Sequence, residues 1–251
     1  MRLHIPGALV CPATATHFCM DRAGLPQSST LMTLNTEIIA HRGVPREARE
    51  NTLASFRLAL SQAADGIELD VHSTQDGVIV VHHDPVVRVV DAMGVPRACA
   101  IVELNAATVL DPALPDGGRL PTLESVLEMV QSQAAVYVEA KATGIAEGLV
   151  ACFDRYPQVR IAVHSFDHRI PVMVRRLRSN IPIGVLSSSY PISLTSFLSG
   201  ARPDAYWQSA ELIDADLVRE AHACGCRVIA WTVNDPDHAR ALIALGVDGL
   251  C

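Results

Sequence analysis

One predicted strand carries two acidic side chains at a spacing that suggests a shared site. Glu68 and Asp70 are separated by one residue, so on a strand both side chains point to the same face, while the apolar residues around them point to the other. Two carboxylates on one interior face repel each other at neutral pH unless a cation or a proton lies between them. The spacing therefore predicts a charged site inside the fold.

A third acid ends a separate apolar run. Glu139 closes the segment AAVYVEAK, and Lys141 lies on the same face if that strand continues. Three convergent carboxylates without a soft ligand nearby indicate one hard divalent cation, Mg²⁺ or Ca²⁺, held by Glu68, Asp70 and Glu139. The alternative is a set of structural ion pairs with Arg or Lys, which are common.

Two histidines could reach that cation. His41 follows the first apolar run, and His83 follows a later one. Around a phosphodiester, one imidazole would take a proton from the attacking group and the other would give a proton to the leaving oxygen. Each histidine taken alone also fits a structural role.

Two cations complete the predicted chemistry. The planar guanidinium of Arg42 could hold a phosphoryl oxygen, and Lys141 could add a point charge beside it. His-Arg-Gly at a strand end would thus supply a proton-transfer group and an anion clamp, and Gly43 would allow close backbone approach.

Short apolar runs that read as buried strands alternate with amphipathic, helix-like stretches. Such repeated strand–helix units predict a parallel sheet. The runs are Glu37–Ala40, Gly66–Val71, Val78–His82, Ala135–Glu139, Arg160–His164, Ile181–Leu186, Ala205–Gln208, Arg227–Thr232 and Val247–Cys251.

One connection is too short for a helix. Only HSTQDG lies between Val71 and Val78, which predicts an antiparallel hairpin that turns at Asp76-Gly77. Simple pairing about that turn would place Asp70 opposite His83. With the returning arm set aside, eight parallel strands remain, which fits a (β/α)8 TIM barrel with its active site at the C-terminal strand ends.

Residues 85–121 do not follow the strand–helix pattern, because they mix prolines and glycines with little periodicity. We expect a small insertion here, after the second strand's hairpin and over one barrel mouth, within a single catalytic domain over residues 35–251. The first 34 residues contain Pro6 and Pro12 and then a Ser/Pro/Gly-rich linker. They are expected to form a poorly ordered extension.

Composition excludes several classes of partner. The chain has 20 Lys and Arg against 27 Asp and Glu, a formal charge of −7, which argues against a nucleic-acid-binding surface. The sequence has no uninterrupted apolar run of the roughly 20 residues that a membrane span needs. Seven cysteines without a CxxC pair favour a reduced, cytoplasmic setting.

Several motifs occur in a characteristic order. They are AHRG, ENT with Phe56, DGIELDVHSTQDGVIVVHHDP, PTLES, VEAK, WTVN and GVDGL. From about Ile38 onward the chain resembles the glycerophosphodiester phosphodiesterase family, most specifically over Gly66–Asp84. The resemblance implies a TIM barrel that hydrolyses glycerophosphodiesters to glycerol 3-phosphate and an alcohol with a divalent cation.

The resemblance also implies roles for individual residues. His41 and His83 match the acid–base pair, and Arg42 and Lys141 match phosphate contacts. The metal-ligand positions correspond to Glu68, Asp70 and Glu139. The chain departs from the family pattern where Arg49 precedes Glu-Asn-Thr and where only Arg88-Val89-Val90 follows the His-Asp pair.

The sequence leaves two other functions open, as well as the roles of two further residues. A lysophospholipase D-like enzyme would act on longer lipid diesters through an apolar channel, and an inactive binding barrel would lack intact acids and histidines. Trp231 fits either a wall beside the substrate or a core position. Glu50 fits either the site or a helix start, where Asn51 could act as a cap. A serine triad from VHSFDH is excluded by crowding on one strand end.

Overall fold

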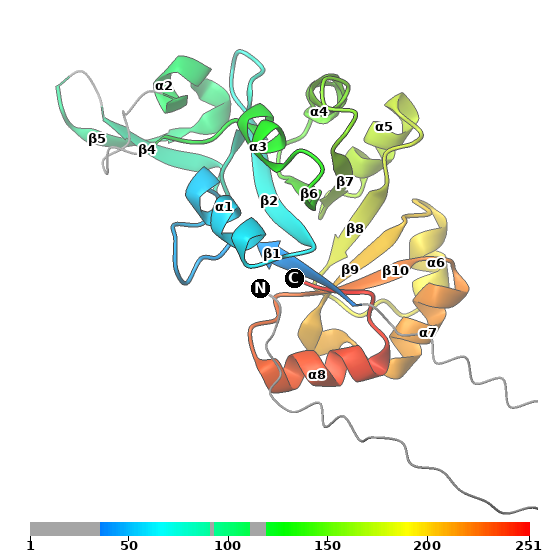
Figure 1. Ribbon diagram of the computed structural model, residues 1–251. Helices are drawn as coiled ribbons and strands as arrows, with labels where there is room; N and C mark the ends of the chain where they lie inside the picture. Colours follow the sequence, from blue (N-terminus) through cyan, green and yellow to red (C-terminus); the bar gives the residue numbers. More distant parts are fainter. Residues whose placement is uncertain (1–35, 91–92, 111–118) are drawn as a thin grey trace, which may run out of the picture.

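The computed structural model describes residues 36–90, 93–110 and 119–251. In this part of the chain, parallel strands alternate with helices and close into a barrel (Figure 1). This closed set of eight parallel strands confirms the predicted (β/α)8 fold. The predicted extension over residues 1–34 lies outside the described residues.

The barrel wall closes because the last strand pairs with the first. Glu37 is in register with Gly249, and the backbone N–H of Glu37 donates to the carbonyl of Asp248 over 3.0 Å. Around the wall the strands are β1 (Glu37–His41), β2 (Gly66–Ser73), β6 (Ala135–Ala140), β7 (Arg160–Ser165), β8 (Ile183–Ser187), β9 (Ala205–Ser209), β10 (Arg227–Trp231) and β11 (Gly249–Leu250).

Helices surround this wall, and side-chain caps fix where several of them begin. The hydroxyl of Thr52 accepts from the backbone N–H of Ser55, so Thr52 caps α1, and the predicted cap Asn51 lies one residue too early. The outer helices are α1 (Leu53–Ser61), α3 (Leu123–Val130), α4 (Ala146–Phe153), α5 (Arg169–Leu177), α6 (Leu194–Ser199), α7 (Ala215–Ala223) and α8 (Pro236–Leu245).

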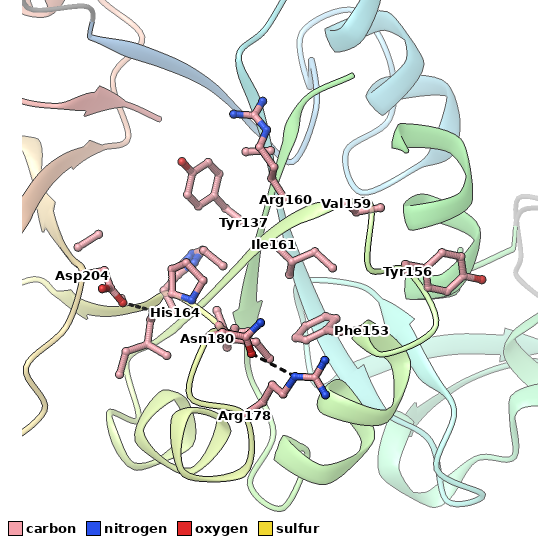
Figure 2. A pocket seen from close by; sticks show the side chains of 18 of the residues that line it. Tyr137, Phe153, Tyr156, Val159, Arg160, Ile161, His164, Arg178, Asn180 and Asp204 are labelled. Carbon is pink, nitrogen blue, oxygen red and sulfur yellow. Dashed lines mark hydrogen bonds between the residues drawn. The ribbon is translucent and has the colours of Figure 1, made fainter. Parts of the chain in front are cut away.

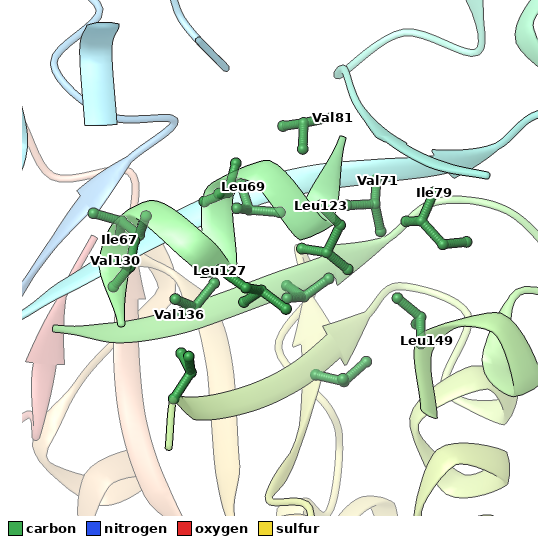
Figure 3. Close-up of a cluster of buried hydrophobic side chains, with 14 of the residues drawn as sticks. Ile67, Leu69, Val71, Ile79, Val81, Leu123, Leu127, Val130, Val136 and Leu149 are labelled. Carbon is green, nitrogen blue, oxygen red and sulfur yellow. The ribbon is translucent and has the colours of Figure 1, made fainter. Parts of the chain in front are cut away.

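The outer faces of the strands pack against these helices. Figure 3 shows the apolar face of β2, Ile67, Leu69 and Val71, against Leu123 and Leu127 of α3. All these side chains are fully buried. Their alternation turns Glu68 and Asp70 to the opposite, interior face, as their spacing predicts.

The predicted antiparallel hairpin is present, but its register is not the predicted one. β3 (Ile79–Val81) pairs with β2 so that Val71 lies opposite Val81, and His82 N–H donates to the carbonyl of Asp70 over 3.0 Å. The expected pairing of Asp70 with His83 is therefore wrong by one residue. The reason is a loop one residue longer than a two-residue turn, with Gly77 at φ 81°.

The insertion begins directly after β3 and has its own structure. β4 (Val86–Val90) and β5 (Pro96–Ala100) form an antiparallel pair, followed by the 3₁₀ turn η1 (Ile101–Glu103) and α2 (Ala106–Leu110). Alternate valines of β4, Val87 and Val89, pack on Ile101 and Val109 in a small separate core. Figure 1 shows this unit projecting beside the β2–β3 hairpin.

The barrel wall has a seam between β7 and β8. Their register runs only from Val163 opposite Ile183 to Ser165 opposite Val185, whereas β7 pairs with β6 from Arg160 onward. A cavity of about 480 Å³ opens where the two strands separate, with Ile161 on one side and Asp204 on another (Figure 2). His164, at the inner end of this cavity, also lines the cavity of the candidate active site.

Among the described helices, none has the length and apolar character required to cross a membrane.

Candidate active site

A second cavity, of about 110 Å³, lies at the C-terminal ends of the barrel strands. This is the end at which barrel enzymes place their active sites. Its lining includes every predicted site residue except Asp70. The lining residues are His41, Arg42, Glu68, His83, Glu139, Lys141, His164, Phe166, Leu186, Trp207, Trp231, Thr232 and Cys251.

The strand register explains why residues distant in sequence meet here. His41 on β1 is in register with Glu68 on β2, and Glu139 on β6 is in register with His164 on β7. Alternation along each strand directs these side chains to the barrel interior.

Glu68, Glu139 and His164 form the tightest group of possible metal ligands. One donor atom of each lies within 4.8 Å of the others, and all three residues are buried. Burial, and next the neighbouring Asp70, raises the pKa of Glu68 well above its ordinary value. Burial likewise raises the pKa of Glu139. An ion or a proton would therefore relieve the electrostatic cost of this group.

Asp70, the remaining predicted ligand, is held by cations and an amide. Its carboxylate lies 3.0 Å from Lys141 Nζ and 3.1 Å from Arg42 Nε, and it accepts from Asn51 Nδ2 over 2.9 Å. Burial raises the pKa of Asp70, but Lys141 and Arg42 outweigh this effect, so the pKa lies below its ordinary value. This carboxylate thus shows the ion pairing that was the alternative to metal binding.

Lys141 bridges two of the acids. Its Nζ lies 2.6 Å from Glu139 Oε1 as well as 3.0 Å from Asp70. Burial lowers the pKa of Lys141, but the two carboxylates outweigh burial and raise it. Lys141 therefore stays charged at the floor of the cavity, where a phosphoryl oxygen could lie.

Arg42 reaches the site from a left-handed backbone conformation, with φ 55°. Its guanidinium lies between Asp70 and Glu50, whose carboxylate accepts from Arg42 Nη1 over 3.3 Å. Glu50 is largely exposed and does not line the cavity. The placement of Glu50 therefore supports a role in orienting Arg42.

The two histidines lie in different surroundings. His41 Nε2 is 3.9 Å from Glu68 Oε2, and burial, with the neighbouring Arg42 charge, lowers the pKa of His41 to about 4. His83 is more exposed, and its Nδ1 lies 2.8 Å from the Asp84 carboxylate. His82, next to His83 in the chain, does not line the cavity.

Part of the cavity wall is aromatic. Trp231 packs edge-to-face against Phe166 with ring centroids 5.5 Å apart, and both line the cavity. An apolar wall of this kind suits the carbon atoms of a small polyol.

Sequence reasoning missed His164, Phe166, Trp207 and Cys251 at this site. His164 was considered only as part of a serine triad, which the structure excludes because Ser165 Oγ donates to the carbonyl of Ala140 over 2.7 Å. The available signal was strand position, since His164 lies one residue before the end of its strand, as Glu139 does. Cys251 was missed because a soft ligand near the acids was not expected.

Comparison with known proteins agrees with this geometry. The model of the glycerophosphoryl diester phosphodiesterase family matches residues 41–251. A glycerophosphodiester phosphodiesterase of Caldanaerobacter subterraneus subsp. tengcongensis is 31% identical over 233 residues, covering 86% of this chain and 93% of the relative.

Solved structures show the same barrel. An Oleispira antarctica phosphodiesterase in complex with its product, sn-glycerol-3-phosphate, superposes with a TM-score of 0.75 at 26% identity, covering 85% of this chain and 91% of that one. A glycerophosphodiester phosphodiesterase of Parabacteroides distasonis gives a TM-score of 0.72 at 26% identity, covering 86% and 92%.

The family match spans the strands that carry the acids, both histidines and both cations of the cavity. On this evidence the chain belongs to the glycerophosphoryl diester phosphodiesterase family.

Proposed function

We propose that this chain hydrolyses glycerophosphodiesters to glycerol 3-phosphate and an alcohol, with a divalent cation as cofactor. The observation that carries the proposal is the convergence of buried acids, two cations and two histidines on one cavity at the C-terminal strand ends. The product in the Oleispira antarctica structure supports the choice of substrate class.

The residues fit a divalent cation. Glu68 and Glu139 are buried with raised pKa values, so a positive charge between them would stabilise their ionised forms. Their carboxylate oxygens alone suit Mg²⁺ or Ca²⁺. Asp70 remains a predicted further ligand, since displacement of Lys141 by the ion would free Oδ1. When bound, the cation would polarise the phosphate and lower the pKa of the attacking hydroxyl or water.

The histidines divide the proton transfers. His41 is neutral above a pKa of about 4, so it can accept a proton from the attacking oxygen at neutral pH. Asp84 holds the Nδ1 side of His83 at 2.8 Å, which leaves Nε2 to give a proton to the leaving alcohol.

The cationic side chains bind the phosphate. Arg42 offers a planar fork and Lys141 a point charge, and both stabilise negative charge that develops on the phosphoryl oxygens. The cavity volume of about 110 Å³ supports a small glycerol moiety at the reacting centre over a longer lipid diester.

The test is release of glycerol 3-phosphate by the purified protein from glycerophosphocholine, glycerophosphoethanolamine and glycerophosphoglycerol. We expect release that a chelator abolishes and that an added divalent cation restores. Lysophosphatidylcholine, a longer lipid diester, serves as the comparison substrate. Preferential cleavage of the lysolipid, or no cleavage of any diester, would contradict the proposal.

A further inference from the structure

We propose that His164 supplies an imidazole nitrogen to the cation held by Glu68 and Glu139, and that this nitrogen gives the site a preference for an ion that favours imidazole, such as Zn²⁺, over Ca²⁺. The inference rests on the proposed function, because it assigns a ligand to the cation of the same site.

The separation between His164 and Glu68 fits two ligands of one ion. His164 Nε2 lies 3.8 Å from Glu68 Oε1, which is too long for a hydrogen bond. Two ligands that each bind one ion at about 2.1 Å lie at most about 4.2 Å apart. The observed distance therefore leaves room for an ion between the two atoms.

His164 otherwise lacks the partners that a buried imidazole needs. The residue is 2% exposed, and its Nδ1 has no hydrogen-bond partner among the described residues. The Glu68 carboxylate lies 3.8 Å from Nε2, beyond hydrogen-bond range, and a carboxylate oxygen of Glu139 lies within 4.8 Å of a ring nitrogen. Because an unpartnered buried polar group is costly, an ion at Nε2 would give this ring the bonding partner that neither nitrogen has among the described residues.

Packing holds the imidazole in place. Its ring stacks on Trp207 with centroids 4.1 Å apart and an interplanar angle of 6°. Gly184 makes this stacking possible, since a Cβ there would lie 2.7 Å from Trp207 Cδ1. The imidazole is therefore pre-positioned toward Glu68, as a metal ligand must be.

His41 is a weaker candidate for the same task. Its Nε2 lies 3.9 Å from the other oxygen of Glu68, and its side chain is 26% exposed. Only His164 groups with both Glu68 and Glu139 in the described residues. The geometry thus separates the ligand histidine from the proton-transfer histidine.

A nitrogen ligand changes which ion the site prefers. Ca²⁺ and Mg²⁺ are hard ions that take oxygen ligands, whereas imidazole suits Zn²⁺, Fe²⁺, Ni²⁺ and Cu²⁺. Replacing one oxygen donor by imidazole therefore shifts the site away from Ca²⁺.

The direct test is pulsed electron paramagnetic resonance of Mn²⁺ bound to the wild-type protein. We expect modulation from a directly coordinated ¹⁴N, replaced by the ¹⁵N pattern when the protein is labelled with ¹⁵N-histidine. This measurement needs no variant, so it does not depend on how a substitution folds.

Variants identify which histidine gives the signal. His164→Phe keeps a ring against Trp207 but removes the nitrogen, and His164→Gln provides a second version if the first is unstable. Either change should abolish the nitrogen coupling to the Mn²⁺ probe and weaken Zn²⁺ binding by at least about tenfold, with a smaller change for Ca²⁺. The matched control His41→Gln should keep the coupling.

The outcomes separate this inference from the proposed function. Metal-dependent hydrolysis with no nitrogen coupling in the Mn²⁺ complex overturns the role of His164 and leaves the activity standing. Coupling that is lost in His41→Gln and kept in His164→Phe also overturns it. A nitrogen signal from His164 without any diester hydrolysis supports the ligand and rejects the proposed activity.

Discussion

His41 and His83 border the same cavity, and their surroundings differ in the way that the proposed division of proton transfers requires. His41 is largely buried beside Arg42, which favours its neutral, proton-accepting form. His83 is more exposed, and Asp84 orients its ring. The difference follows from position, because one residue ends a barrel strand and the other follows the edge strand of a hairpin.

Removing either histidine should slow the reaction without unfolding the protein. We expect His41→Ala and His83→Ala to lower kcat by roughly 10²- to 10⁴-fold, the usual effect of losing a general acid or base. Glycerol 3-phosphate release measures the effect, and thermal melting checks the fold. His82→Ala is the matched control, since His82 does not line the cavity. Wild-type turnover in His41→Ala or His83→Ala would remove that residue from the mechanism.

Glu68 should couple ion binding to stability. An ion that binds only the folded state raises the melting temperature with concentration. Glu68→Gln removes a charge from the centre of the ligand group, so we expect the melting response to divalent ions to disappear. Scanning calorimetry with and without ion measures this.

Glu147→Gln, on the exposed first turn of α4, should respond as the wild type does. A melting response to ions that survives in Glu68→Gln would exclude Glu68 as a ligand.

At this scale the sequence predicted the inward acids but missed one histidine. Strand alternation is enough to place Glu68 and Asp70 on one face. His164 was not identified as a site residue because its neighbours Ser165 and Asp167 suggested a serine triad. Whether a buried imidazole has a partner depends on tertiary contacts that local pattern does not contain.

Among the elements, the β2–β3 hairpin has strands that follow from the residue pattern and a register that does not. The sequence predicted its two arms and antiparallel sense, but not its register. A two-residue turn at Asp76-Gly77 and the observed longer loop differ by one residue, and that residue decides whether His82 or His83 faces Asp70. The loop is fixed by Thr74, whose hydroxyl accepts from Val78 N–H over 3.0 Å.

Asp76 ties this hairpin to the insertion in a pH-dependent way. Its carboxylate accepts from the Thr74 hydroxyl over 2.6 Å and from the Ala106 backbone N–H over 2.9 Å. The Thr74 hydrogen bond and then the Ala106 hydrogen bond lower the pKa of Asp76 below its ordinary 3.8. The contribution to stability is therefore present above the unfolded-state pKa and is lost as pH falls through the folded-state pKa.

We expect Asp76→Asn to melt below the wild type at pH 7, because a neutral amide accepts more weakly than a carboxylate. The gap between the two melting temperatures should shrink as the pH falls below about 4. Thermal melts at a series of pH values measure it. A gap that is constant across this range would show that the charge of Asp76 is irrelevant.

The insertion was predicted as a segment but not as structure. In its β4 strand, valines at alternate positions are buried. The prolines and glycines on either side interrupt this period-two pattern, so the strand could not be recognised from the sequence. None of its described residues lines the active-site cavity. Its described contacts lie instead with the β2–β3 hairpin, as between Gln75 N–H and the carbonyl of Leu104 over 2.9 Å.

For the barrel as a whole, the number and order of the strands were predictable, but the length over which neighbouring strands pair was not. Counting apolar runs is enough to predict a barrel once the hairpin arm is set aside. How far two neighbouring strands stay together depends on the closed geometry, so neither the two-residue β11 nor the β7–β8 seam could be foreseen.

The side chain of Asp248, just before β11, joins the start of the last strand to β10 and α7. Its Oδ2 accepts from Val228 N–H over 2.7 Å and lies 2.8 Å from His222 Nε2. Asp248→Ala leaves that N–H without its acceptor, so we expect a loss of about 1–3 kcal/mol. This corresponds to a lower melting temperature by roughly 2–4 °C per kcal/mol for a chain of this size.

The matched control is Asp237→Ala, an exposed aspartate in the first turn of α8. It should melt close to the wild type, and a similar fall in both variants would show that Asp248 has no special part in closure.

The seam between β7 and β8 coincides with a division in the outer core. One apolar cluster joins β2, β6 and β7 to α1, α3, α4 and α5, and another joins β8, β9 and β10 to α6, α7 and α8. A chain cut between Ile181 and β8 would leave the buried residues of each cluster on one fragment. Both proposed proton-transfer histidines would lie on one fragment, and Trp231 and Cys251 on the other. Co-expression of the two pieces is thus expected to reconstitute activity by fragment complementation, making this barrel a candidate split-enzyme reporter.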